Sequence, residues 1–210
     1  MICDCKKISF YNFKDLSYWE NKKITTDEDK IVKYLLKKSL KDKVIFHVGI
    51  GNSSLASKLL KKKFKYLYGI TIANSEVSFA SKLNIKNYKV CLLDKHNINL
   101  KKKIKKKFDI IIDNNLKSYS CCEKNFSNYF GSLVGLLKKN GMIITSKKGM
   151  KWYKKLQIKK TFSLTKFFFN KIKEVRGSRK NMLTLNNVKY LSNRYSLKTT
   201  MNKDLVILKK

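Results

Sequence analysis

The stretch Val44-Ile45-Phe46-His47-Val48-Gly49-Ile50-Gly51-Asn52-Ser53-Ser54-Leu55 decides the fold of this chain. A mostly apolar run precedes two glycines, and small polar residues then lead into an apolar helical pattern. This order predicts a buried strand that turns tightly into a helix. Glycine has no Cβ, so Gly49 and Gly51 let the backbone turn sharply and let a ligand approach it closely. In α/β folds such a turn lies at the carboxyl edge of the sheet, where ligands bind.

Strand patterns and helix patterns alternate on both sides of this stretch. The expected strands are residues 44–48, 66–72, 88–93, 108–113 and 142–145, and the expected helices are residues 26–40, 53–63, 77–83 and 122–138. The lysine-rich residues 101–107 are interpreted as a charged connection that forms a solvated helix face. Regular alternation of this kind predicts an α/β fold, a doubly wound and mostly parallel sheet with right-handed crossovers.

The ends of several elements carry their own signals. Thr26-Asp27-Glu28-Asp29 resembles a capping box that starts the first helix, and Asn140-Gly141 is typical of a helix C-cap. Residues 194–200 and 204–208 read as two strands joined by Met201-Asn202-Lys203. This terminal hairpin brings the expected sheet to seven strands and makes its last edge antiparallel.

The chain of 210 residues is long enough for one domain with a sizeable core. We expect an N-terminal arm over residues 1–25 that packs on a single domain of residues 26–210, within which residues 147–180 form a basic, aromatic segment on the substrate side. The sequence shows no secretory signal and no apolar run of the roughly 18 residues that a membrane helix needs, which favours a cytoplasmic protein. The five cysteines form no CxxC pair, so no metal site is expected. We expect the cysteines to be reduced thiols.

The formal net charge of +35 has two interpretations. The basic residues are almost all lysine, proline is absent and asparagine is plentiful, which is the composition that an AT-rich genome produces. A surface selected for phosphate recognition would be expected to use more arginine, whose planar fork matches phosphate. Composition bias is therefore the preferred interpretation, and a dedicated nucleic-acid surface stays open as the second.

The order of the motifs resembles that of the class I S-adenosylmethionine-dependent methyltransferases, which have a Rossmann-like sheet. The resemblance covers residues from about 30 to 210. Residues 46–52 resemble the cofactor loop of that family, and residues 136–144 (LLKKNGMII) resemble its "LLKPGG" entry to the fifth strand without the proline. The ends of the family's second, third and fourth strands resemble residues 68–74, 92–94 and 108–115, in that order. The family's last strand resembles residues 204–210.

The resemblance implies a role for each matching residue and S-adenosyl-L-methionine as cofactor. His47, Gly49, Gly51 and Asn52 belong to the loop, whose glycines would line the methionine part of the cofactor. Thr71 would face the ribose hydroxyls, and Asp94 would accept from the adenine amino group. Asp113 and Asn114 would face the methionine moiety and the substrate, at the point where the strand order reverses.

Two positions depart from the family pattern. His47 stands where the loop usually has Asp or Glu, and Thr71 replaces the usual ribose-binding acid, although some subfamilies also read "GIT" here. Structural interpretations stay open beside the functional ones: His47 as a hydrogen-bonded residue beneath the loop, Asp94 as a loop cap and His96 as a surface histidine. Asp113 ends an apolar strand, where a carboxylate is costly without a role or a partner.

The resulting functional hypothesis is metal-free, direct methyl transfer to a small molecule or to a sugar or lipid precursor, with Asp113 and His96 as catalytic base candidates for a hydroxyl acceptor. The first alternative is an RNA methyltransferase that uses residues 147–180 as a basic stacking surface. The second is a binding protein without catalysis on the same fold, since a fold does not determine a function. The oligomeric state is left open.

Overall fold

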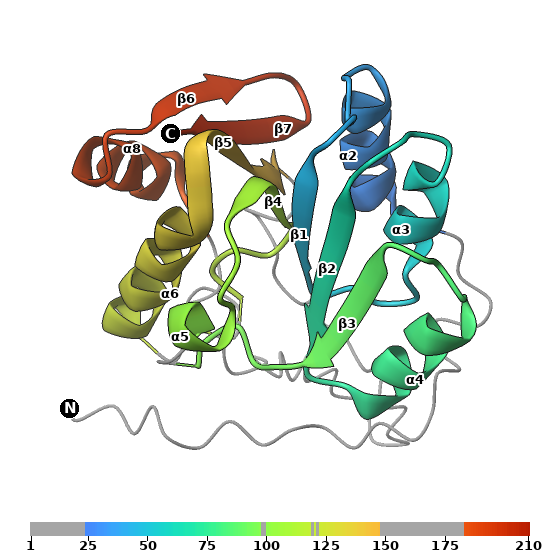
Figure 1. Ribbon diagram of the computed structural model, residues 1–210. Coiled ribbons are helices and arrows are strands. Elements are labelled where there is room, and N and C mark those ends of the chain that lie inside the picture. The colour runs from blue at the N-terminus through green and yellow to red at the C-terminus, as the bar shows by residue number, and fades with distance from the viewer. Residues whose placement is uncertain (1–23, 98–99, 119, 121, 148–182) are drawn as a thin grey trace, which may run out of the picture.

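The computed structural model of the chain describes residues 24–97, 100–118, 120, 122–147 and 183–210. In these residues seven strands form one sheet in the order β3-β2-β1-β4-β5-β7-β6 (Figure 1). The strands are β1 (Val44–Val48), β2 (Tyr66–Thr71), β3 (Tyr88–Leu92), β4 (Phe108–Asp113), β5 (Leu137–Ser146), β6 (Lys198–Met201) and β7 (Leu205–Lys209). The pairs among β1 to β5 are parallel, whereas β7 is antiparallel to both β5 and β6. The seven-stranded sheet with an antiparallel hairpin is therefore confirmed.

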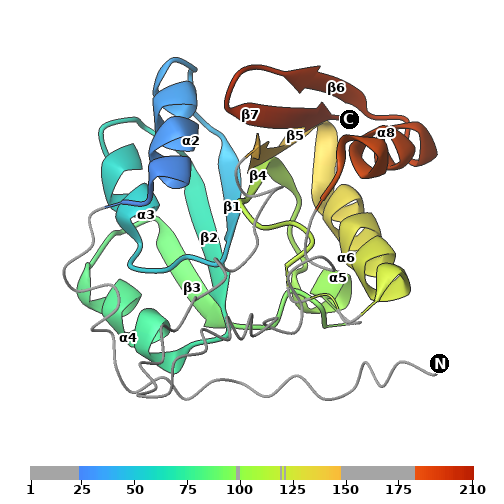
Figure 2. The same cartoon turned by 180° about the vertical axis from the view of Figure 1, so that it is seen from behind.

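Helices cover both faces of the sheet, as a doubly wound fold requires (Figures 1 and 2). They are α2 (Thr26–Leu36), α3 (Ser54–Leu59), α4 (Asn74–Lys82), α5 (Leu100–Lys103), α6 (Glu123–Leu136) and α8 (Leu185–Arg194). Side chains alternate across each strand. Ile45 and Ile110 belong to the core shared with α2 and α3, and their neighbours Phe46 and Ile111 belong to the core shared with α5, α6 and α8.

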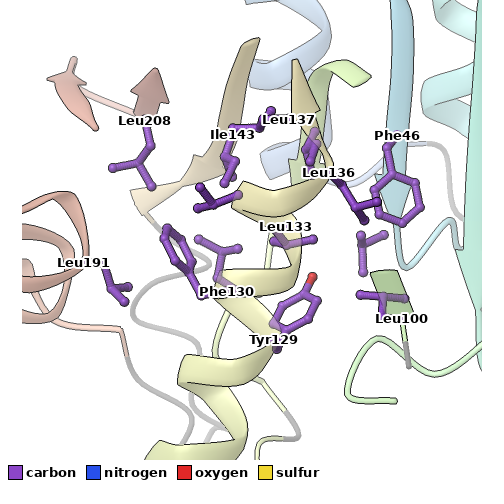
Figure 3. Close-up of a cluster of buried hydrophobic side chains, with 14 of the residues drawn as sticks. Phe46, Leu100, Tyr129, Phe130, Leu133, Leu136, Leu137, Ile143, Leu191 and Leu208 are labelled. Carbon is purple, nitrogen blue, oxygen red and sulfur yellow. The ribbon is translucent and has the colours of Figure 1, made fainter. Parts of the chain in front are cut away.

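The core beneath α6 is the more aromatic of the two (Figure 3). Phe46 of β1 and Phe108 of β4 are stacked with ring centroids 4.8 Å apart, and Phe130 and Leu133 of α6 are fully buried with them in one cluster. Each such side chain contributes about 1.5–3 kcal/mol when it is buried. This packing fixes α6 against the central strands.

The predicted C-cap at Asn140-Gly141 is wrong. α6 ends at Leu136, because Leu137 is already extended and pairs with Phe108 of β4. The register then shifts so that Ile110 pairs with Met142, and Asn140 in the intervening bulge has a φ of 63°. A Cβ at Gly141 would lie 3.0 Å from the carbonyl oxygens of Lys138 and Phe108. The glycine thus belongs to a bulged strand, where backbone passes close to backbone.

Other element boundaries also differ from the sequence predictions: the helix expected over residues 26–40 ends at Leu36, and the helix expected over residues 77–83 spans Asn74–Lys82. The cap of α2 is Thr25 rather than Thr26, since the Thr25 side chain accepts from the amide of Glu28. The helix expected to reach residue 63 ends at Leu59. Arg194 is the last residue of α8, a helix that the sequence analysis did not predict, and not the start of a strand.

Some expectations fall on residues whose structure is not described. The N-terminal arm, except for residues 24 and 25, and the basic segment, except for Lys147, lie outside the described residues, and so does Cys121. Among the described cysteines, Cys91 and Cys122 are free thiols. In the described ranges no helix combines the length and apolarity needed to cross a bilayer.

Candidate functional site

The glycine loop lies where β1 ends, beside the ends of β2 and β4 (Figure 1). Gly49 and Gly51 both have positive φ, 73° and 52°, which non-glycine residues adopt rarely. The amide of Gly49 donates to the carbonyl of Ile70 at 2.9 Å, and Asn52 Oδ1 accepts from the amide and the hydroxyl of Ser54. A Cβ built on Gly49 would meet no atom of the described residues within 4 Å. The loop is thus fixed by hydrogen bonds and has open space above its first glycine.

The loop after β4 presents an acceptor to the same edge of the sheet. Asn114 follows the last residue of β4, and its Oδ1 is buried without a hydrogen-bond partner among the described residues. A buried acceptor that lacks a donor costs about 1–3 kcal/mol. The backbone carbonyl of Asn114 accepts from Thr145 Oγ1 of β5 at 3.4 Å, which helps to hold this residue in place. An ammonium or amide donor from a ligand would satisfy Asn114 Oδ1.

Asp94 lies two residues after the end of β3 and is buried. Its Oδ1 accepts from the amide of His96 at 2.8 Å, as in a loop cap. Asp94 therefore caps this loop, as the structural interpretation expected. The cap uses one of its two carboxylate oxygens, and a ligand role for Asp94 stays a prediction.

His47 lies beneath the loop and faces α2, where its Nε2 is 3.6 Å from Oε1 of Glu28. Both side chains are buried, His47 to 1% exposure. Burial lowers the pKa of His47 to about 4, against a smaller opposite effect of Asp113. Burial raises the pKa of Glu28 to about 7, although the hydrogen bonds from Thr25 oppose this. Between about pH 4 and pH 7 the two groups are therefore a neutral imidazole and a neutral carboxyl, not an ion pair.

Thr71 is the last residue of β2, and its hydroxyl both donates and accepts a hydrogen bond. Thr71 Oγ1 donates to Glu76 Oε2 at 2.5 Å and accepts from the amide of Ala73 at 3.1 Å. Glu76 lies in the first turn of α4, where the helix dipole favours a negative charge. The end of β2 thus has a carboxylate after all, five residues beyond the threonine.

Asp113, the last residue of β4, is 2% exposed and is surrounded by donors. Its Oδ2 accepts from Tyr129 of α6 at 2.6 Å and pairs with the Lys95 ammonium at 3.1 Å, and its Oδ1 accepts from the amide of Asn115. Lys95 also donates to the carbonyl of Asn115 at 2.5 Å and to Ser118 Oγ at 3.1 Å. Burial lowers the pKa of Lys95, and Asp113 acts against this shift. Lys95 therefore joins the segment after β3 to the loop after β4.

His96 is buried to 5% exposure, so the interpretation as a surface histidine is wrong. Its Nε2 lies 2.8 Å from the carbonyl of Ser118, and its ring meets the Tyr129 ring edge-on with centroids 5.1 Å apart. Burial and the Lys95 charge lower the pKa of His96. Since a carbonyl only accepts, Nε2 carries the proton of the neutral ring. His96 Nδ1 then has a lone pair, and it has no partner in the described part of the chain.

The sequence analysis missed Glu28, Glu76, Lys95 and Tyr129. A sequence signal existed for Glu76 alone, because an acid in the first turn of the helix after β2 lies near the end of that strand. No group of three or more histidine, cysteine, aspartate or glutamate side chains that could hold a metal ion occurs among the described residues.

The fold is shared with solved structures. The N-methyltransferase NodS from Bradyrhizobium japonicum WM9, in complex with S-adenosyl-L-homocysteine, superposes with a TM-score of 0.58 at 12% identity, over 88% of this chain and 87% of that one. The magnesium protoporphyrin IX methyltransferase ChlM from Synechocystis PCC 6803, with S-adenosylmethionine bound, has a TM-score of 0.55 at 13% identity, over 87% and 77%. The chain has the fold of the class I S-adenosylmethionine-dependent methyltransferases.

The methyltransferase fold does not by itself determine a reaction. The [4+2]-cyclase SpnF is also similar to this chain, with a TM-score of 0.55 at 10% identity, over 82% of this chain and 58% of that one. No protein-family model and no curated protein matches the sequence. The activity must therefore be argued from the site.

Proposed function

We propose that this chain is an S-adenosylmethionine-dependent methyltransferase that acts on a small molecule by direct transfer without a metal. One observation carries the proposal. The open space above Gly49 and the unpartnered Oδ1 of Asn114 lie on neighbouring strands at the same edge of the sheet. Together they offer backbone without a Cβ and an acceptor for an ammonium group, which suits an amino-acid moiety such as the methionine part of this cofactor.

The remaining cofactor contacts follow from the loops around this edge. Gly49, Gly51 and Asn52 would form the turn against the cofactor, Asp94 would accept from the adenine amino group, and Thr71 with Glu76 would face the ribose. His47 would support the loop from below as a neutral group. When bound, the cofactor supplies an electrophilic methyl group. The protein's own task is then to align the acceptor with it and to keep water away.

Asp113 and His96 are the candidate bases for a hydroxyl acceptor, and their surroundings differ. The Asp113 oxygens already accept from Tyr129, Lys95 and Asn115. His96 Nδ1 has a lone pair without a donor in the described residues. For this reason His96 suits proton removal better, and Asp113 suits the fixing of the loop that follows β4.

Calorimetry with S-adenosylmethionine tests the proposal directly. We expect measurable heat and a rise in melting temperature. No heat and no thermal shift at millimolar cofactor would defeat the cofactor assignment and would favour a binding protein without catalysis.

Asp94→Asn separates the adenine contact of Asp94 from its loop cap. The asparagine oxygen can still accept from the amide of His96, whereas its NH₂ group would face the adenine amino group. We expect affinity for the cofactor to fall about 10–100-fold, because a donor would oppose a donor. The melting temperature without cofactor should stay near that of the wild type. An affinity equal to that of the wild type would leave Asp94 with its capping role only.

Glu76→Gln tests whether the carboxylate after β2 replaces the missing acid. Glutamine can still accept from the Thr71 hydroxyl, so the local structure should persist. We expect about tenfold weaker binding of S-adenosylmethionine by calorimetry, because the ribose hydroxyls would lose a charged acceptor. Glu123→Gln, at the start of α6, is the matched control and should bind as the wild type does. Equal affinities in both variants would remove Glu76 from the site.

A further inference from the structure

A pocket lies along α6, and no residue of the glycine loop lines it. It has a volume of about 350 Å³ and is lined by the segment before α5, by α5, by α6 and by the end of α8. Among the described residues, its charged lining residues are Lys101 and Arg194, and the rest of the lining is amide, hydroxyl, ring and glycine. We call it the α6 pocket.

The inner wall of the α6 pocket holds two buried acceptors. His96 and Asn125 both line the pocket, and each is 5% exposed. His96 Nδ1 and Asn125 Oδ1 have no hydrogen-bond partner among the described residues. The ring of His96 is neutral with its proton on Nε2, so Nδ1 can only accept. These two acceptors are therefore available to hydroxyl or N–H donors of a ligand.

The mouth of the α6 pocket holds cations. The Arg194 guanidinium donates to the Tyr190 hydroxyl at 2.8 Å, and it lies 6.0 Å and 5.8 Å from the ring centroids of Tyr190 and Tyr195. These contacts limit the rotamers of Arg194 before any ligand binds. Lys101 lines the pocket from the α5 side. An anionic group suits such a mouth, because no acidic side chain among the described residues lines the pocket.

From these two ends we infer that the α6 pocket binds a phosphorylated polyol, whose hydroxyls donate to His96 Nδ1 and Asn125 Oδ1 and whose phosphate pairs with Arg194 and Lys101. The volume lies in the range of small-ligand sites. The site also adjoins Asp113, because Tyr129 lines the pocket and donates to that carboxylate at 2.6 Å. No residue of the glycine loop takes part, and the inference shares only His96 with the proposed function, where that residue is a candidate base.

The test uses the two histidines of the chain. Protein labelled with ¹⁵N-histidine is titrated with ribose 5-phosphate, without S-adenosylmethionine, and the ring nitrogens are followed by NMR. We expect the unprotonated Nδ1 of His96 to shift in a saturable way while both nitrogens of His47 stay unchanged. Ribose alone and inorganic phosphate alone should bind more weakly than ribose 5-phosphate, because each satisfies one end of the pocket.

Matched variants on α8 locate the anion. Arg194→Gln should weaken binding of ribose 5-phosphate about tenfold by removing a charge-assisted contact, and Lys189→Gln, an exposed cation on the same helix, should not. Three results would each overturn the inference: an unchanged His96 signal, a proton found on Nδ1, or equal binding of ribose 5-phosphate and inorganic phosphate, which marks nonspecific attraction to a basic surface. Because the cofactor is absent, these outcomes are independent of any failure to bind it.

Discussion

Glu28→Gln is expected to make the folded protein about 2 kcal/mol less stable at pH 4.5 than at pH 6.5, relative to the wild type. With Glu28 removed, His47 stands alone with a folded pKa of about 4, well below its ordinary 6.5. Between these values the unfolded chain binds a proton on His47 that the folded chain does not. Stability then falls as the pH falls, by about 1.4 kcal/mol per pH unit.

His47→Gln is expected to have the opposite slope. Glu28 then remains, with a folded pKa of about 7 against an ordinary 4.5. Between these values the folded chain holds a proton that the unfolded chain releases, so stability falls as the pH rises. In the wild type the two effects cancel between pH 4.5 and 6.5, because each state binds one proton on this pair.

Urea denaturation of the wild type, both single variants and the double variant at pH 4.5, 5.5 and 6.5 measures these slopes. Slopes are compared with the wild type, so that all other titrating groups cancel. The double variant should return to the wild-type slope. Parallel curves for all four proteins would mean that Glu28 and His47 do not share a proton in the way described.

Lys95→Met is expected to destabilise the protein by about 3–5 kcal/mol. The change leaves the buried Asp113 carboxylate without the cation that lies 3.1 Å from its Oδ2, and an uncompensated buried charge costs about that much. It also removes the donor that joins Asn115 O and Ser118 Oγ to the segment after β3. The effect should be larger than that of most single substitutions.

A double-mutant cycle separates the charge from the packing. Lys95→Met combined with Asp113→Asn should recover much of the lost stability, because the orphaned charge is gone. Lys89→Met, an exposed lysine of β3, is the control and should stay within about 0.5 kcal/mol of the wild type. If Lys95→Met unfolds at the wild-type urea midpoint, Lys95 does not stabilise this part of the site.

The strands were predictable because their signal is local. The strands at residues 44–48 and 108–113 were predicted with their observed bounds, since apolar runs end there at a glycine loop and at a carboxylate. α8 was not predicted, because its sequence LNNVKYLSNR is mostly polar and buries only Val188, Leu191 and Ser192. The end of α6 was wrong because pairing of Leu137 with β4 overrides a local helix-stop signal.

The composition of the candidate site was only partly predictable. Its glycines and strand-end residues follow from the order of elements. The partners of those residues do not, because Lys95 meets Asp113 across 18 positions and Tyr129 meets it across 16. In a chain so rich in lysine, nothing in the sequence distinguishes Lys95, whose ammonium pairs with a buried carboxylate, from the lysines at the surface.

The position of β7 has a consequence for synthesis on the ribosome. β7 is the last described strand in the chain, yet it lies between β5 and β6 and pairs with residues 142–146. Until it emerges, β5 presents an open row of amides and carbonyls that another nascent chain can pair with. The sheet can therefore close only after residues 205–209 have emerged, and the growing chain must be kept apart from its neighbours until then.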